Sequence, residues 1–165
     1  MDNNLFFDFA VDKESKSIHI QREFNTNIPT IWKAWTQPVF LDKWWGPQPW
    51  RAETKSINFK EGGSWLYAMV SPEGEKHWSK TTFSSIENEK YLSQTDAFTD
   101  ENGNINPNFP QSIIKTTFSS FNNNVKVDMF IKYNTLEELE QTLNMGFQEG
   151  MTIDFKQLDA LLKQI

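Results

Sequence analysis

Cysteine is absent from all 165 residues of this chain. That absence excludes disulfides, thiolate metal ligands and cysteine nucleophiles. The chain also has no run of 18 apolar residues, so no membrane-spanning helix is expected. Residues 1–4 carry no basic side chain, and the apolar run at residues 5–7 is too short for a signal peptide. Together these absences favour a protein of the reducing cytoplasm.

Clustered positive charge is also missing. The formal net charge is −6, and the lysines are scattered along the chain. A sequence-independent nucleic-acid binder needs a basic surface, so this class is excluded. His19 and His77 have no His or Cys partner at metal-ligand spacing, and no Gly-rich phosphate loop occurs. We therefore expect no metal and no cofactor. The sequence has no nucleophile-elbow motif, although it does not exclude a Ser-His-Asp triad.

Aromatic residues, in contrast, are abundant. Seven Trp and fourteen Phe residues occur in the chain. Each aromatic side chain removes about 150–250 Å² from water when it is buried. This supply is enough for a core and for the lining of a pocket.

Alternating patterns predict an antiparallel sheet of short strands. The clearest is at residues 64–70, where Trp65, Tyr67 and Met69 share one face and apolar residues also occupy the other. This arrangement indicates a strand buried on both sides. Further strands are expected at residues 17–24, 50–59, 76–86, 91–98, 112–121 and 125–133. The Asn-, Gly- and Pro-rich residues 99–110 predict a long loop, and residues 1–14 an arm or irregular edge element.

Helices are expected at both ends of this meander. Asn27 and Pro29 mark the start of a short helix around Trp32, and a second one follows at residues 39–45. Thr135 with Glu138 is a capping box. An apolar stripe with three- and four-residue steps then predicts one long helix over residues 136–163. The expected outcome is a curved sheet that grips a long helix, with an apolar pocket between them.

Six short motifs occur in a fixed order along this framework. They are Arg22-Glu23-Phe24, Ala34-Trp35-Thr36-x-Pro38 with Leu41, Trp44-Trp45-Gly46-Pro47, Gly62-Gly63-x-Trp65, Pro72-x-Gly74 and Met145-Gly146-x-x-Glu149-Gly150. Together they resemble the activator of heat-shock-protein-90 ATPase homologue family of the START-like, Bet v 1-like (SRPBCC) superfamily. The match spans residues 18–162, nearly the whole chain.

The resemblance implies an α+β helix-grip fold. In it, an antiparallel sheet of six to seven strands wraps a long C-terminal helix, and two short helices follow the first strand. Residues 1–165 would then form a single START-like domain with residues 1–14 as an N-terminal arm. The resemblance also implies a cavity for a small apolar ligand. It does not imply one particular activity, because proteins of the same fold have different functions. The co-chaperone that names the family has an additional chaperone-binding domain, for which this chain has no room, so contact with heat-shock protein 90 is doubtful.

The helix at residues 136–163 carries the candidate site. Gly146 and Gly150 fall on the side expected to face the sheet, where a glycine either lets the helix approach closely or leaves a gap for a ligand. Asp154 is the one carboxylate near the centre of this face. Buried there, it would have a raised pKa and could anchor a ligand or serve as an acid or base. The alternative is that it pairs with a strand lysine or reaches solvent at the cavity mouth.

The predicted pocket has a volume of roughly a few hundred Å³. Its ligand-binding residues are predicted to be Trp65, Tyr67, Met69, Phe118, Met129, Leu143, Gly146, Phe147, Gly150, Met151 and Asp154. We assign no catalytic residue and no metal ligand.

The sequence therefore favours a binding protein for an apolar or aromatic small molecule, more than an enzyme. Two alternatives stay open. One is an enzyme of the same fold, such as a cyclase, dehydratase or hydrolase that uses a cavity carboxylate. The other is a chaperone-associated, stress-response interaction module, which would need an exposed apolar patch. No nucleic-acid or membrane partner is expected, and a homodimer is left open.

Overall fold

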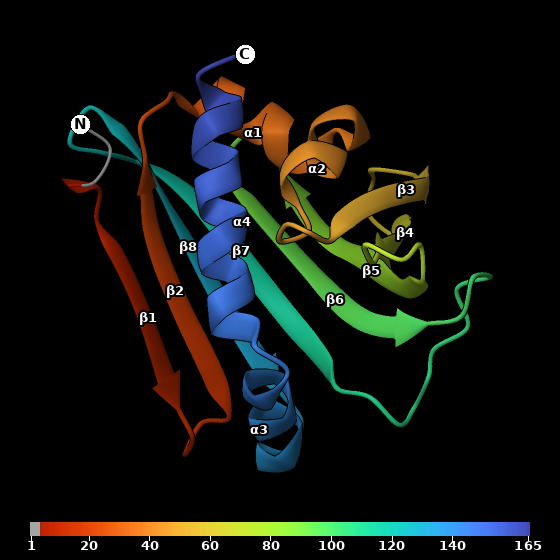
Figure 1. The fold of residues 1–165 in the computed structure, drawn as a ribbon. Coiled ribbons are helices and arrows are strands. Elements are labelled where there is room, and N and C mark those ends of the chain that lie inside the picture. The colour runs from red at the N-terminus through yellow and green to blue at the C-terminus, as the bar shows by residue number, and fades with distance from the viewer. Residues whose placement is uncertain (1–3) are drawn as a thin grey trace.

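Figure 1 shows a computed structural model of the chain, which describes residues 4–165. Eight antiparallel strands form one sheet in the order β1-β2-β8-β7-β6-β5-β4-β3. The strands are β1 (Phe7–Asp12), β2 (Ser17–Phe24), β3 (Arg51–Ile57), β4 (Ser64–Val70), β5 (Lys76–Glu87), β6 (Tyr91–Thr99), β7 (Gln111–Phe121) and β8 (Asn124–Tyr133). The helices are α1 (Ile28–Thr36), α2 (Pro38–Trp44), α3 (Leu136–Asn144) and α4 (Phe147–Leu162).

All four helices lie on one side of the curved sheet (Figure 1). Helix α4 crosses in front of β2, β8 and β7, while α1 and α2 lie beside it towards β3. The predicted helix-grip architecture is therefore confirmed, with two short helices after the strand at residues 17–24.

The sheet has eight strands where the sequence analysis expected six to seven. The additional edge strand is β1, which lies in the segment assigned to the N-terminal arm. It pairs along β2, and its Phe7 and Phe9 rings lie 5.9 Å from Phe155 and 6.1 Å from Phe147. Because Phe7, Phe9 and Val11 alternate with Asp8, Ala10 and Asp12, a period-two pattern was present, but only pairing to β2 brings Phe7 and Phe9 against α4 and leaves Phe9 half-buried.

The prediction of one uninterrupted helix over residues 136–163 is wrong. Helix α3 ends at Asn144, and Gly146 has a left-handed backbone with φ of 86° before α4 begins at Phe147. Glycine adopts this conformation without the steric cost that a Cβ would impose, which makes it a common residue just past a helix end. The apolar stripe continues across the break because both helices bury residues on the same side of the sheet.

The predicted helix starts agree with the structure. The Asn27 side chain accepts a hydrogen bond from the Thr30 N–H at 2.9 Å, which caps α1. At α3, the Thr135 hydroxyl accepts from the Glu138 N–H at 3.1 Å. Each bond satisfies one of the backbone donors that have no partner within the first turn.

The loop at residues 99–110 packs on the face of the sheet that points away from the helices. A Cβ placed on Gly103 would lie 3.7 Å from Lys80 Cδ and 3.9 Å from Leu66 Cδ2. Leu66 follows Trp65 in β4 and therefore points to the opposite face. The loop thus contacts the outer side of β4 at Leu66, which is buried.

Candidate functional site

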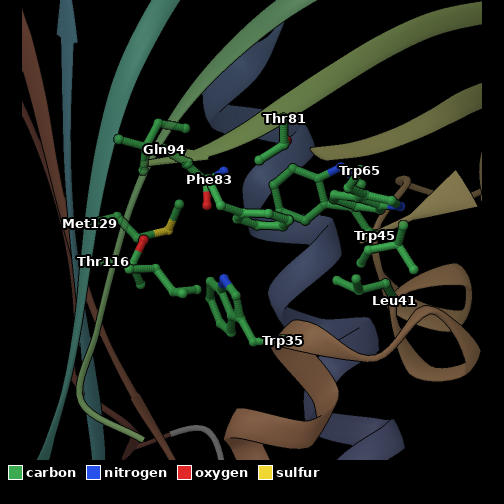
Figure 2. A pocket seen from close by; sticks show the side chains of 12 residues that line it. Trp35, Leu41, Trp45, Trp65, Thr81, Phe83, Gln94, Thr116 and Met129 are labelled. Atoms are coloured by element: carbon green, nitrogen blue, oxygen red, sulfur yellow. The ribbon is translucent and has the colours of Figure 1, made fainter. Parts of the chain in front are cut away.

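A small cavity lies between the sheet and the pair of short helices. Trp35 of α1, Leu41 of α2 and Trp45 just after α2 form its helical wall, and residues of β3 to β8 form the rest (Figure 2). The cavity volume is about 30 Å³, which is room for about one or two water molecules.

Tryptophan rings dominate one side of this cavity. The centroids of the Trp45 and Trp65 rings lie 6.3 Å apart. The Trp65 ring stacks on the Tyr67 ring, with 4.0 Å between their centroids. On the helical side, the centroid of the Trp35 ring lies 4.8 Å from that of Trp44 and 5.5 Å from that of Phe118. The cavity wall is therefore one continuous layer of aromatic rings.

Hydrogen bonds hold the two tryptophans that face each other. Trp45 Nε1 donates to the Tyr67 hydroxyl at 3.0 Å, and Trp65 Nε1 donates to Thr54 Oγ1 at 3.0 Å. The Thr54 hydroxyl in turn donates to Asp42 Oδ1 at 2.6 Å. Because each indole N–H has its partner, the rings present mainly apolar surface to the cavity.

The strand side of the cavity contains three hydrogen-bonding side chains, Thr81, Gln94 and Thr116 (Figure 2). Thr81 and Gln94 both donate to Asp96 Oδ1, at 2.8 Å and 3.0 Å. Burial raises the pKa of the Asp96 carboxyl to about 6, against the smaller opposing effect of these two hydrogen bonds. The sequence analysis missed Asp96, although its spacing from Leu92 and Gln94 places it on the same face of β6.

Only some of the predicted ligand-binding residues lie at this cavity. Trp65 and Met129 line it directly. Tyr67 and Phe118 are one ring further away, stacked on Trp65 and packed on Trp35 respectively. Met69 lies further along the same face of β4, where it is half-buried and opposite His77 of β5.

The predicted residues of the C-terminal helices do not line the cavity. Leu143 and Phe147 are half-buried, and the Phe147 ring packs against Phe9. Met151 is buried in the core. Gly146 links α3 to α4, and a Cβ on Gly150 would lie 3.6 Å from Pro47 Cγ, so this glycine faces the turn after α2.

The predicted pocket of a few hundred Å³ between sheet and C-terminal helix is replaced by packed side chains. Phe155 of α4 is 1% exposed, and its ring lies 5.4 Å from that of Phe24 in β2. Leu158 and Leu162 extend the same contact along the helix and are also buried. Because these side chains fill the space under α4, the cavity lies beneath α1 and α2 instead.

Asp154 is buried at 4% exposure on α4. Its Oδ1 accepts a hydrogen bond from the Gly46 N–H at 3.2 Å. Burial raises the pKa of this carboxyl to about 8, while the Gly46 bond opposes that rise. Asp154 therefore joins α4 to the turn that follows α2, and it stands outside the cavity lining.

Residues 4–165 also offer neither a metal site nor a membrane-spanning helix. No group of three or more His, Cys, Asp or Glu side chains in this range could hold a metal ion. No helix there is long and apolar enough to cross a membrane.

Comparison with known families places this geometry in context. The family model for Activator of Hsp90 ATPase homolog 1-like proteins matches residues 25–163. No protein with a curated function matches the chain.

Solved structures with the same fold come from several bacteria. A crystal structure of a Mycobacterium smegmatis protein has 30% sequence identity and a TM-score of 0.87, with 96% of each chain covered. An Arthrobacter aurescens protein has 28% identity and a TM-score of 0.89, with 96% of this chain and 92% of that chain covered. The AHSA1 protein from Silicibacter pomeroyi, at 17% identity and a TM-score of 0.71, covers 90% of this chain and 98% of its own and shares the fold.

Proposed function

Because the chain belongs to the Activator of Hsp90 ATPase homolog 1-like family, we propose that it binds a small apolar or aromatic molecule in the cavity beneath α1 and α2. The observation that carries this proposal is the composition of the wall. Three tryptophans supply broad apolar faces, and Thr81, Gln94 and Thr116 supply a few directed polar groups. Small-molecule sites typically combine these two features.

Occupancy requires the cavity to enlarge. An organic ligand needs a few hundred Å³, and the closed cavity has about 30 Å³. Trp45 is the wall residue best placed to move, since it is half-buried and follows the end of α2. Its indole N–H bond to Tyr67 is the polar contact that such a movement breaks. In the binding reaction, Trp45 swings outwards and the ligand ring takes its place against Trp65.

The same geometry favours a binder over an enzyme that uses Asp154. The Asp154 carboxylate accepts the Gly46 N–H and lies outside the cavity lining. A general acid or base must come within hydrogen-bond reach of the reacting group.

The test is a pair of neighbouring substitutions on β7. Thr116 lines the cavity at 1% exposure, and Thr117 is exposed on the opposite face of the same strand. The probe is the uncharged dye N-phenyl-1-naphthylamine, followed by its fluorescence, together with native mass spectrometry of the purified protein for a co-purified small molecule. Thr116→Phe should fill the cavity and abolish saturable dye binding, whereas Thr117→Phe should leave it unchanged. Equal binding by both variants, each shown to be folded by circular dichroism, rules out this cavity as the site.

A further inference from the structure

Asp96 lies in the middle of β6 on the face of the sheet that lines the cavity. It pairs with Thr81 of β5 on one side and Ser112 of β7 on the other. Residues directly opposite each other in antiparallel strands point to the same face. Since Thr81 and Gln94 line the cavity and both bond to Asp96, the carboxyl group is one side chain away from the ligand space.

The two oxygen atoms of this carboxyl group differ in their contacts. Oδ1 accepts both hydrogen bonds, from Thr81 and from Gln94. Within residues 4–165, every buried side-chain nitrogen or oxygen atom has a hydrogen-bond partner. Oδ2 receives no hydrogen bond from a side chain in that range, so it is not completely buried, which agrees with the half-buried state of Asp96. One oxygen is thus positioned by the protein, and the other is available to a ligand.

No basic side chain of the neighbouring strands compensates this carboxylate. Lys80 of β5 and Lys115 of β7 are one residue away from Thr81 and Ile114, so they point to the outer face. The ion pairs of the described residues do not include Asp96. A carboxylate in partly apolar surroundings without a cation is costly to ionise, and a cationic ligand group would remove that cost.

Aromatic rings stand on both sides of this carboxylate. Burial is the main cause of the raised pKa of Tyr67 in β4 and Tyr133 in β8, and the nearby charge of Asp96 adds to the rise for each phenol. Trp65 lies in register with Thr81, the residue that holds the carboxylate. An ammonium group gains from a carboxylate and from the faces of neighbouring aromatic rings at the same time.

We propose that Asp96, held by Thr81 and Gln94, anchors a protonated amine of the ligand, so that the molecule taken by the cavity is an aromatic or apolar amine. This inference rests on the proposed function and specifies its ligand class. The ring system occupies the space between Trp45 and Trp65, and the amine donates a hydrogen bond to Asp96 Oδ2.

The experiment uses three probes of one shape, naphthylmethylamine, naphthalenemethanol and naphthoate, titrated calorimetrically into the full-length protein. The wild-type protein should bind the amine at least about tenfold more tightly than the alcohol, as expected for a hydrogen bond to a charged group. Asp96→Asn should remove this preference and leave the affinity for the alcohol within about twofold. The control is Asp128→Asn, because Asp128 bonds to His19 and Gln21 on the outer face of the sheet. It should retain the full preference.

A second variant keeps the inference testable if Asp96→Asn does not fold. Thr81→Val removes one bond to Oδ1 and keeps the carboxylate, so it should weaken the amine preference without abolishing it. An unchanged amine preference in Asp96→Asn, or tightest binding of naphthoate, overturns the inference.

The outcomes also separate this inference from the proposed function. If the alcohol binds and Thr116→Phe blocks it, but the amine binds no more tightly, the cavity is the site and only the assignment of Asp96 fails. If none of the three probes binds, or if Thr116→Phe blocks none of them, the proposed function fails together with the inference.

Discussion

The two halves of the inner sheet face are packed in different ways. Under α4, the Phe24 ring of β2 packs against Phe155, while Ile18 and Ile20 are completely buried, and one ion pair joins Arg22 of β2 to Asp159 of α4. Under α1 and α2, tryptophans, threonines and Gln94 surround a cavity, and Trp45, Gln94 and Asp96 retain partial exposure. Aliphatic and phenylalanine side chains have no polar atoms and can pack without gaps. Tryptophans and polar side chains must also satisfy hydrogen bonds, and these bonds set where the rings stand.

This difference is the reason for proposing that the half beneath α1 and α2 binds the ligand. The half beneath α4 is the stabilising core, in which any enlargement would cost contacts on every side. The half beneath α1 and α2 already contains a small cavity, and one wall residue, Trp45, lies outside the helices and strands. The predictions below test whether the two halves differ in this way.

The largest effect is expected in the α4 half. Phe155→Ala should destabilise the protein by about 3–5 kcal/mol, because it removes a ring that is packed against Phe7 and Phe24 and leaves a cavity. Urea unfolding followed by circular dichroism measures this loss. A loss below about 1 kcal/mol would mean that α4 is not the better-packed half.

Asp154 lies at the junction of the two halves and should make the stability of the protein depend on pH. Its pKa is about 8 in the folded protein, above the ordinary value of 3.8. The folded state therefore holds a proton that the unfolded state releases between these two values. From this group alone, stability should fall by up to about 1.4 kcal/mol for each pH unit between about pH 4 and pH 8.

Asp154→Asn should remove this dependence, because an amide oxygen can still accept the Gly46 N–H. The variant should be about equal to the wild type near pH 4 and more stable by about 3 kcal/mol or more at pH 8. Unfolding curves of both proteins across this range provide the measurement. A variant that loses several kcal/mol at pH 7 would instead identify Asp154 as one half of an ion pair.

A substitution at Gly46 tests the turn that follows α2, at the border of the cavity half. The φ of Gly46 is 121°, and a Cβ there would lie 2.7 Å from the backbone nitrogen of Ala52. Gly46→Ala should therefore cost about 1–3 kcal/mol from backbone strain, with the clash in addition. Gly74 is the matched control, since its φ is also positive, at 91°, but a Cβ there meets nothing within 4 Å. Equal melting temperatures for the two variants would contradict the close approach at Gly46.

The smallest effect is expected at Trp45. Trp45→Phe keeps a ring in the wall and removes the hydrogen bond to Tyr67, so it should cost about 0.5–1.5 kcal/mol. Trp78→Phe on the outer face serves as the control. If Trp45→Phe were as damaging as Phe155→Ala, Trp45 would be an ordinary core residue, and the contrast between the two halves would disappear.

Much of the fold could be predicted because its signals are local. The alternation of Trp65, Tyr67 and Met69 predicted β4, and the Asn27 and Thr135 caps predicted the starts of α1 and α3. The ordered motifs from Arg22 to Gly150 predicted the family, which the match over residues 25–163 confirms. Even the break after α3 had a local signal, because Gly146 stands where a helix-ending glycine is expected.

The position of the cavity was predicted less well than the fold because it depends on contacts between distant segments. Trp65 and Met129 could be chosen from their strand faces, but the α4 residues were placed at a cavity that Phe155 and Leu158 fill. Asp96 is held by a hydrogen bond from its cross-strand neighbour Thr81, a contact that no pattern within β6 reveals.

The sequence by itself therefore determined the strands, the helix starts and the family, since periodicity and capping act over a few neighbouring residues. Only the tertiary structure decided that β1 joins the sheet, that the space under α4 is filled, and that the cavity lies beneath α1 and α2. The physical reason is that empty space is what remains after all side chains have packed. It depends on the volumes and registers of every element that surrounds it.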